Sequence, residues 1–363
     1  MKILYDNEIF LIQKYGGATR YFYELIKRMI EFKGADISLY MGYHINEYGL
    51  EKYADKFRYF KGKKIPLIPK TKLILRKIQY FNFLKFRERC KPDLFHQTYF
   101  NDYKNRAGEK KIVTIHDFTH EKYPEYFSKI DKTIYQKKKA AETSDGIICI
   151  SESTKNDLLE YYKIPESRIR VIYHGNSLNA EPGERVISRP YFLYVGDRRA
   201  YKNFEIMLKL FSTSDNIKRD FRLVCFGGGS FTRTEQRIIN EYDLQNIVMQ
   251  ISGNDEKLAG LYKYAEMFVY PSFYEGFGIP LLEAMQYECP IVASNTNALR
   301  EIGGEAALYF EPGNTESLIE AVNSLLSSED KRNEIISKGR ERIRLFSWDK
   351  CAEETYNFYK EII

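Results

Sequence analysis

Two glutamates, Glu275 and Glu283, stand eight positions apart in the stretch PSFYEGFGIPLLEAM, residues 271–285. The apolar run MFVY precedes this stretch, and Pro280 suits the first turn of a helix, so a strand, a loop and a helix are expected in that order. Glu275 then precedes the helix, and Glu283 lies about one turn inside it. A carboxylate at each position can accept hydrogen bonds from sugar hydroxyls, which makes the pair a candidate for contacts with two sugars.

The turn between the two glutamates is rich in glycine and opens the expected helix. The first N–H groups of a helix have no partner within it, and the helix dipole favours an anion beside them. We expect the N–H groups of Phe277, Gly278 and Ile279 to hold phosphate oxygens, with Leu282 on the following turn. The stretch therefore predicts a diphosphate with a sugar at each end. A carboxylate that complements the helix dipole is the plainer explanation of Glu275.

A cationic cluster follows another expected strand in VGDRRAYKNF, residues 195–204. Arg198, Arg199 and Lys202 come after a turn at Gly196 and shortly before a helix. Cations at a strand end can neutralise a diphosphate, and a nucleoside diphosphate leaving group needs this compensation in the transition state. A solvated turn would give the same pattern.

Three glycine-containing segments also follow expected strands. Gly16 and Gly17 open the first helix in GGATRY, where exposed N–H groups favour a phosphate. This segment lacks the GxGxxG spacing of a dinucleotide fingerprint, and a plain tight turn explains it equally well. Gly228 in FGGGS and Gly253 in SGND are placed to line a nucleotide pocket.

His116 follows an apolar strand in TIHDFTH, next to Asp117. The carboxyl ends of parallel strands face the ligand crevice, where a histidine can donate to a sugar hydroxyl or transfer a proton. A His–Asp pair that caps a turn is the alternative. His96, in DLFHQ, is a second candidate after a strand. The remaining histidines are expected to be structural: His44, His120 and His174.

Apolar runs alternate with amphipathic stretches along the chain, which is typical of βα units on a parallel sheet. The expected fold class is α/β, with two Rossmann-like, doubly wound domains that face a cleft. The best linker candidate is NSLNAEPGERVISRP, residues 176–190. We place an acceptor-side domain at 1–182 and a donor-binding domain at 183–346. The amphipathic segment 347–363 is expected to cross back and pack on the first domain.

The individual elements follow from the same periodicity, and Ser151 is expected to cap one helix. The expected strands are KILY, ISLYM, DLFH, KIVTI, GIICI and RVIY in the first domain, and YFLYV, FRLVCF, IVMQI, MFVY and PIVAS in the second. The expected helices lie near 18–32, 129–143, 152–162, 203–213, 232–241, 255–265 and 280–287.

Composition narrows the class of protein. Hydrophobic residues make up 44% of the 363 positions and charged residues 29%, which is typical of a globular protein. The five cysteines show no CxxC spacing, which favours reduced thiols in a cytoplasm over a disulfide scaffold or a zinc site. We expect no signal peptide at the N-terminus and no transmembrane helix.

The segment 52–91 concentrates positive charge, with fourteen Lys or Arg residues against two acidic ones, interleaved with aromatic side chains. Such a segment fits peripheral contact with an anionic membrane, or a solvated helix whose lysine stems cover apolar surface. Nucleic acid is a third reading, which no RNA-binding or zinc signature supports. We therefore expect no nucleic acid partner.

Together these motifs resemble those of the family 4 retaining glycosyltransferases, which have the GT-B fold and an E-x7-E motif. The resemblance spans nearly the whole chain. Its segments, in the family's order, are GGATRY, TIHD, ISEST, RVIYHGN, YVGDRRAYKN, FGGGS, EGFGIPLLEAM and PIVASNTNALREIGGEAALYFEP.

The resemblance implies a role for each matching residue. Glu275 is expected to contact the donor sugar and Glu283 the ribose hydroxyls. Arg198 and Lys202 look like the basic pair that stabilises the leaving group, and Arg199 competes with Arg198. The expected catalytic residues are His116, Arg198, Lys202 and Glu275. The expected donor-binding residues are Gly16, Gly17, Arg199, Gly228, Gly253, Phe277, Gly278, Ile279, Leu282 and Glu283.

The implied activity is retaining transfer of a hexose, with a mannose-like sugar preferred, by a front-face route in which the leaving phosphate takes the acceptor proton. The donor is expected to be a GDP-sugar in preference to a UDP-sugar. The acceptor would be a glycan or a polyprenyl-diphosphate-linked saccharide in lipopolysaccharide, O-antigen or exopolysaccharide synthesis, at the inner face of the cell membrane. The sequence contains no D-x-D, so we expect neither a metal nor a cofactor.

Two other functions share the expected fold. One is a nucleotide-sugar 2-epimerase, which would turn over a donor without any acceptor. The other is an inactive scaffold that binds a nucleotide sugar.

Overall fold

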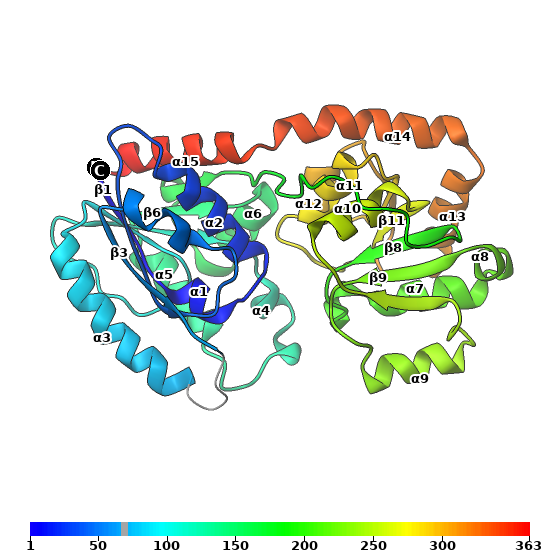
Figure 1. The fold of residues 1–363 in the computed structure, drawn as a ribbon, viewed down its shortest axis with the longest axis horizontal. Coiled ribbons are helices and arrows are strands. Elements are labelled where there is room, and N and C mark those ends of the chain that lie inside the picture. Colours follow the sequence, from blue (N-terminus) through cyan, green and yellow to red (C-terminus); the bar gives the residue numbers. More distant parts are fainter. Residues whose placement is uncertain (67–71) are drawn as a thin grey trace. The chain divides into compact units, whose positions relative to one another are not determined.

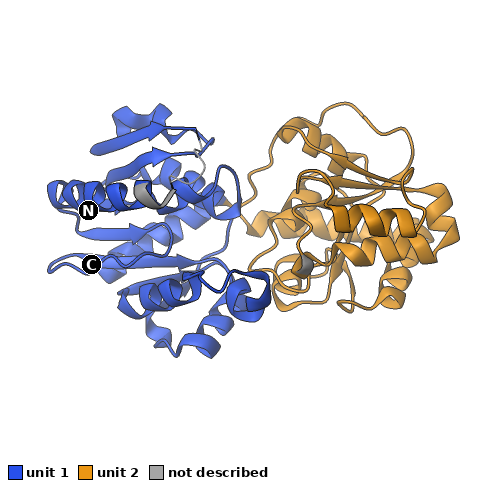
Figure 2. Ribbon diagram, turned by 90° about the horizontal axis from the view of Figure 1, so that it is seen from below, with its two compact units in different colours: residues 1–174, 348–363 blue, residues 175–347 orange. Residues whose placement is uncertain are grey.

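The computed structural model describes residues 1–66 and 72–363, with the backbone alone for 72–74 and 200. The chain divides into two compact units (Figure 2). Unit 1 contains residues 1–174 and 348–363, and unit 2 contains residues 175–347. Between the last strand of unit 1 and the first strand of unit 2, residues 172–190 form neither helix nor strand.

Unit 1 is built on a seven-stranded sheet in the order β3-β2-β1-β4-β5-β6-β7, with every neighbouring pair parallel. The strands are β1 Lys2–Tyr5, β2 Asp36–His44, β3 Tyr59–Lys64, β4 Leu94–Gln97, β5 Lys110–Ile115, β6 Gly146–Cys149 and β7 Ile169–Val171. The sequence did not predict β3, because its segment YFKGKK carries three lysines and a glycine. Such a strand is tolerated at a sheet edge, where charged side chains discourage further pairing.

The helices of unit 1 follow the strands along the chain (Figure 1). They are α1 Glu8–Ile12, α2 Gly17–Met29, α3 Lys72–Cys90, α4 Thr119–Lys122, α5 Thr133–Thr143, α6 Glu152–Tyr162 and α15 Trp348–Ile362, with 3-10 turns at Leu50–Lys56, Pro124–Tyr126 and Glu166–Arg168. The Ser151 side chain caps α6 as predicted, because it accepts a hydrogen bond from the Thr154 N–H at 3.0 Å.

The C-terminal helix α15 belongs to unit 1 and packs beside α2 (Figure 1). Its Trp348 and Tyr359 are buried in the core that also contains Tyr21. The Tyr359 hydroxyl lies 3.0 Å from the Tyr5 hydroxyl and is also hydrogen-bonded to His96. This helix of fifteen residues, at the far end of the chain, therefore completes the core of the first unit.

Unit 2 is built on a six-stranded parallel sheet in the order β10-β9-β8-β11-β12-β13. The strands are β8 Tyr191–Val195, β9 Arg222–Phe226, β10 Val248–Ile251, β11 Met267–Tyr270, β12 Ile291–Ser294 and β13 Leu308–Phe310. The helices are α7 Phe204–Thr213, α8 Asp215–Asp220, α9 Arg233–Glu241, α10 Asp255–Lys263, α11 Ile279–Gln286, α12 Asn297–Gly303, α13 Thr315–Leu326 and α14 Glu329–Arg342, with 3-10 turns at Ala200–Lys202 and Ile343–Leu345.

In each sheet the direction of strand addition reverses once. Unit 1 adds β2 and β3 on one side of β1 and then crosses to β4 on the other side. Unit 2 does the same around β8, adding β9 and β10 before it crosses to β11. In open α/β sheets ligands bind at such a switch point, beyond the carboxyl ends of the strands. The fold thus marks one ligand-binding edge in each unit.

Candidate functional site

The switch point of unit 2 brings Lys202 and Glu275 together. Lys202 ends the 3-10 turn after β8, and Glu275 lies in the loop after the neighbouring strand β11. The Nζ atom of Lys202 is 2.7 and 2.8 Å from the two carboxylate oxygens, and Ser272 donates a further hydrogen bond to the carboxylate at 2.6 Å. Burial is the largest single influence on the pKa of Lys202 and lowers it, but the charge and hydrogen bond of Glu275, together with Tyr201 and Asp197, raise that pKa above its ordinary value. The pair therefore places an ammonium group and a carboxyl group side by side at the ligand edge.

Glu283 lies in α11, about one turn inside the helix as predicted. Its side chain is buried, with 6% of the residue exposed, and Tyr262 in α10 donates a hydrogen bond to it at 3.0 Å. Tyr262 thus fixes the orientation of this carboxylate. This contact could not be predicted from a local pattern of residues, because Tyr262 lies on a different helix.

The turn before α11 contains Gly278 in a backbone conformation that favours glycine. Gly278 is left-handed, with φ 109° and ψ 48°, and a Cβ there would come within 2.9 Å of Leu299. Pro280 lies in the first turn of the helix as predicted. The side chains of Phe277 and Leu282 are buried, so any ligand contact from these positions comes from the backbone.

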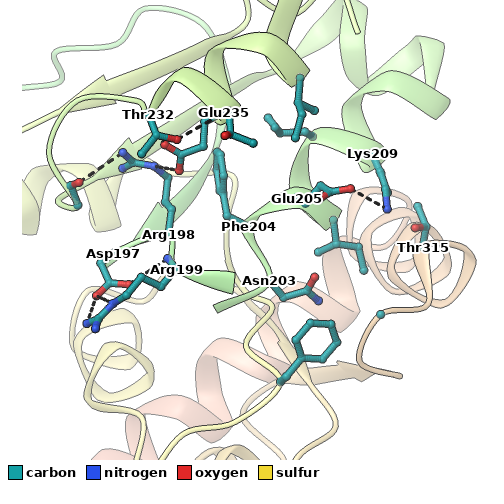
Figure 3. Close-up of a pocket in the computed structure, with 17 residues that line it drawn as sticks. Asp197, Arg198, Arg199, Asn203, Phe204, Glu205, Lys209, Thr232, Glu235 and Thr315 are labelled. Atoms are coloured by element: carbon teal, nitrogen blue, oxygen red, sulfur yellow. Dashed lines mark hydrogen bonds and ion pairs between the residues drawn. The ribbon is translucent and has the colours of Figure 1, made fainter. Parts of the chain in front are cut away.

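Arg198 and Arg199 leave the chain in opposite directions (Figure 3). The Arg198 side chain is 2% exposed, pairs with Glu235 at 2.8 Å and donates to the carbonyls of Gly227, Gly229 and Ser230. The Arg199 side chain is 60% exposed and pairs with Asp197 at 2.5 Å. Arg198 therefore holds the glycine-rich loop after β9 in place, whereas the guanidinium of Arg199 is the more accessible of the two.

The two glycines predicted to line a nucleotide pocket differ in their surroundings. Gly228 has φ 68°, and a Cβ there would meet Arg198 at 2.6 Å and the Gly196 carbonyl at 2.9 Å. A Cβ at Gly253 would meet the flexible side chain of Lys257 instead. Only at Gly228 do both conformation and space require glycine.

In unit 1, Gly16 and Gly17 open α2 at the ligand edge. Gly16 has φ 154° and ψ 163°, and a Cβ there would lie 2.5 Å from Oε1 of Gln13. That Gln13 oxygen accepts a hydrogen bond from the Thr19 hydroxyl at 2.6 Å. The loop is therefore closely packed, and a side chain at Gly16 would displace it.

His116 follows β5 and is partly buried, and its Nε2 atom has no hydrogen-bond partner among the described residues. Burial lowers the pKa of His116 to about 4, although the charge of Asp117 opposes the shift. The imidazole is therefore neutral at pH 7, and one nitrogen can still donate to or accept from a ligand. His96, by contrast, is fully buried and bonded to Thr114 at 2.9 Å as well as to Tyr359, which is a core arrangement.

Sequence reasoning missed a group of polar side chains after β1 and β4, at the switch point of unit 1. Oδ2 of Asp6, both polar side-chain atoms of Asn7 and Oε1 of Gln97 are buried without a hydrogen-bond partner in the described part of the chain. The other Asp6 oxygen accepts hydrogen bonds from the N–H groups of Glu8 and Thr98. Burial, followed by the charge of Glu8, raises the pKa of Asp6 to about 7. The polar run DNE directly after KILY was the signal that could have found them.

The described residues contain neither a candidate metal-binding group nor a candidate membrane-spanning helix. Across 1–66 and 72–363, no three His, Cys, Asp or Glu side chains gather in a group that could hold a metal ion. None of the helices in the same ranges is long and apolar enough to span a membrane.

Known proteins share this architecture. The structure is similar to sucrose-phosphate synthase from Thermosynechococcus elongatus, with a TM-score of 0.78 and 20% identity over 99% of this chain and 98% of that one. It is also similar to Anabaena HepE in complex with UDP and glucose, with a TM-score of 0.74 and 14% identity over 99% and 100% of the two chains. The two parallel sheets and these neighbours define a two-domain GT-B fold, as predicted.

Sequence comparison identifies the family. The O-antigen chain mannosyltransferase B of Escherichia coli is 26% identical over 99% of this chain and its own full length. The O-antigen chain mannosyltransferase RfbU of Salmonella typhimurium is 26% identical over 69% of each chain. Residues 15–179 match the model described as glycosyltransferase family 4, and residues 180–342 match glycosyl transferases group 1. The chain belongs to the family 4 glycosyltransferases.

The two arginines should differ in their effect on stability. We expect Arg198→Ala to lower the free energy of unfolding of unit 2 by about 3 kcal/mol, because it leaves Glu235 and the loop carbonyls unpaired. Arg199→Ala removes an exposed pair and should change it by less than about 0.5 kcal/mol. Urea unfolding measures these changes in free energy. The fluorescence of the single tryptophan, Trp348, reports on unit 1, whereas circular dichroism reports on both units, so a loss of stability in unit 2 appears in the second signal alone. Equal losses in the two variants would contradict the assignment.

Proposed function

We propose that this protein moves a hexose from a nucleoside-diphosphate sugar to a glycan or lipid-linked saccharide in polysaccharide synthesis. The observation that carries the proposal is the Lys202–Glu275 pair at the switch point of unit 2, within the segment that matches glycosyl transferases group 1. The names of the O-antigen relatives support the polysaccharide context.

In the proposed mechanism, the donor diphosphate lies at the N-terminus of α11, where Gly278 leaves the backbone open to close approach. Lys202 compensates the negative charge that develops on the leaving phosphate. Glu275 accepts hydrogen bonds from the donor sugar, and Glu283 accepts them from the ribose. Arg199 is the more accessible arginine for the diphosphate, while Arg198 positions the loop after β9.

We infer that the reaction retains the anomeric configuration by a front-face route and needs no metal. The leaving phosphate oxygen takes the proton of the acceptor hydroxyl as the new glycosidic bond forms and the bond to the phosphate breaks. His116 is neutral at pH 7, so it can hydrogen-bond to the donor sugar or the acceptor without competing for that proton. The unpartnered polar atoms of Asp6, Asn7 and Gln97 are candidate contacts for acceptor hydroxyls.

Changes to the ion pair should slow transfer strongly and leave the fold intact. We expect Glu275→Gln and Lys202→Met each to lower kcat by about 100- to 1,000-fold, the usual effect of removing one charge-stabilising group. Lys263→Met, at an exposed position of α10, is the matched control and should keep full activity. The assay measures sugar transfer to a lipid-linked acceptor and, separately, consumption of the nucleotide sugar without acceptor.

Full turnover in both ion-pair variants would contradict the site. Conversion of the nucleotide sugar to an isomer in the acceptor-free assay would instead identify a 2-epimerase. Nucleotide-sugar binding without any turnover by the unmodified chain would identify a scaffold.

We propose a GDP-linked, mannose-like donor, because two relatives are named mannosyltransferases. A UDP-sugar is the alternative, since the HepE structure contains UDP and glucose. A ligand at 100 times its Kd stabilises the folded state by about 2.7 kcal/mol. Thermal unfolding with GDP, UDP, ADP and dTDP, each alone and as its sugar, should therefore show the largest shift with GDP and GDP-mannose. A larger shift with UDP would reverse the assignment.

Peripheral membrane contact through residues 52–91 also remains a proposal, and residues 67–71 of that segment lie outside the described ones. In the described part, Phe57 and Phe83 are buried in cores and Tyr80, Leu84 and Phe86 pack against one. Ile78 and Phe81 of α3 stay exposed, Phe81 by 64%, beside exposed lysines and arginines such as Lys77 and Lys85. Those two apolar side chains are the candidates for contact with lipid.

Sedimentation with anionic vesicles tests the membrane contact. We expect binding that weakens at high salt, because basic residues near an anionic surface are screened within about a Debye length. Phe81→Glu should reduce the bound fraction, whereas Leu345→Glu, at an exposed apolar position in unit 2, should leave it unchanged. If vesicle binding changes neither at high salt nor in Phe81→Glu, residues 52–91 are not the part of the protein that contacts the membrane.

A further inference from the structure

Unit 2 contains a cavity of about 590 Å³ whose greater part lies outside the residues that we assign to the proposed reaction. It opens where α7, α9 and α13 begin, and Figure 3 shows its lining. Arg198, Arg199 and Gly228 are among the described lining residues, whereas Lys202, Glu275 and Glu283 are not. The cavity therefore shares its two arginines with the proposed donor site but does not include the ion pair.

The cavity and the ion pair are built on the same two loops. Asn203, which lines the cavity, is adjacent to Lys202, and Phe273, also in the lining, lies two residues before Glu275. The N–H of Phe273 donates to the carbonyl of Tyr201 at 2.9 Å and ties the loops together. A molecule bound in the cavity would thus contact the residues next to both members of the pair.

Asn203 is the residue that points to a ligand. It precedes α7 in the left-handed conformation, with φ 53° and ψ 38°, and is 8% exposed. Asparagine at this position usually caps the helix with its side chain, but here it makes no capping hydrogen bond. Its Nδ2 is buried and has no partner in the part of the chain that the structure describes. A buried amide donor without a partner costs free energy, which an oxygen of a bound molecule would recover.

The charges around the cavity favour an uncharged ligand. Three cations line it, and each is paired with an acid that also lines it: Arg198 with Glu235, Arg199 with Asp197, and Lys209 with Glu205 at 3.0 Å. The N-termini of α9 and α13 are already capped by the side chains of Thr232 and Asn314. Apart from the exposed guanidinium of Arg199, which we assign to the donor diphosphate, these features supply little positive potential for a phosphate inside the cavity.

The remaining lining suits a saccharide. Phe273 presents a ring that is 39% exposed, which can pack against the apolar face of a sugar ring. The hydroxyls of Thr234 and Thr315, and the charged ends of Glu205 and Lys209, are available at the lining for sugar hydroxyls. A largely apolar cavity with a few directed polar groups is the usual form of a small-ligand site.

We propose that this cavity binds a hexose of the acceptor or product glycan other than the one that reacts. The proposal rests on the proposed transfer to a glycan. It adds a second saccharide subsite in the donor-binding unit, joined to Lys202 and Glu275 through the two loops. Longer acceptors would then bind more tightly than a single sugar.

Three variants of the full chain test the subsite. Thr234→Trp places a large side chain at the lining from the first turn of α9, where the position is exposed. Asn203→Gly keeps the left-handed conformation and removes the amide. Gln236→Trp is the matched control, because it is exposed on the same helix and absent from the described lining. Circular dichroism and thermal unfolding verify that each variant folds.

Saturation-transfer NMR with methyl α-mannopyranoside and mannotriose, with GDP and UDP in excess, measures binding away from the nucleotide site. We expect equal signals in the unmodified chain and Gln236→Trp, and signals about tenfold weaker in Thr234→Trp and Asn203→Gly, the size of effect that one lost hydrogen bond to a ligand can have. Equal signals in all four proteins would overturn the proposal. Displacement of the sugar by inorganic phosphate would also overturn it and make the cavity an anion site.

Kinetics give a second readout. In Thr234→Trp, KM for a three-sugar acceptor should rise while KM for the donor stays unchanged, and an unchanged KM for both would count against the subsite.

The proposed function and the proposed subsite can fail separately. A chain that binds mannotriose in the cavity but transfers no sugar would disprove the proposed function and leave the subsite standing.

Discussion

The ion pair between Lys202 and Glu275 joins two loops whose strands, β8 and β11, are neighbours only because the sheet reverses its order of addition between them. Each partner is mostly removed from solvent, so either charge alone would be costly, and together they hold the loops in place without a ligand. Ser272 and Tyr270 add hydrogen bonds to the same carboxylate. In the proposed reaction, Lys202 would turn to the diphosphate of the donor and Glu275 to its sugar, so the two residues of this pair would each contact the substrate.

Unit 1 repeats the architecture with a different chemistry. Its switch point also lies where strand addition reverses, between β1 and β4, but beside the Arg76–Glu8 pair it collects the unpartnered polar atoms of Asp6, Asn7 and Gln97. His116 is neutral at pH 7, and the carboxyl group of Asp6 has a pKa raised to about 7. Unpartnered donors and acceptors of this kind suit hydroxyl groups, which agrees with the acceptor side that we propose for unit 1.

The loop between β8 and α7 contains two adjacent arginines, Arg198 and Arg199, that have different surroundings. Arg198 turns inward to hold the glycine-rich loop after β9, and Arg199 remains at the surface beside Asp197 (Figure 3). The loop then continues to Asn203, whose left-handed backbone starts α7 and whose side chain makes no cap. Consequently the residues between β8 and α7 contribute to the ion pair and to the lining of the neighbouring cavity.

The sequence by itself determined the α/β class, most strands, about half of the helices, and the fact that Glu275 and Lys202 each follow a strand, because these depend on local periodicity and turn chemistry. Two strands were not predicted, because β3 is rich in lysine and β13 has three residues, and the helices α3, α13 and α14 were not predicted either. Only the tertiary structure decided which carboxylate meets which cation and which arginine is buried. Lys202 and Glu275 are 73 positions apart, and their contact depends on the order of strands in the sheet. Strand order is a long-range property, so no local pattern of residues records it.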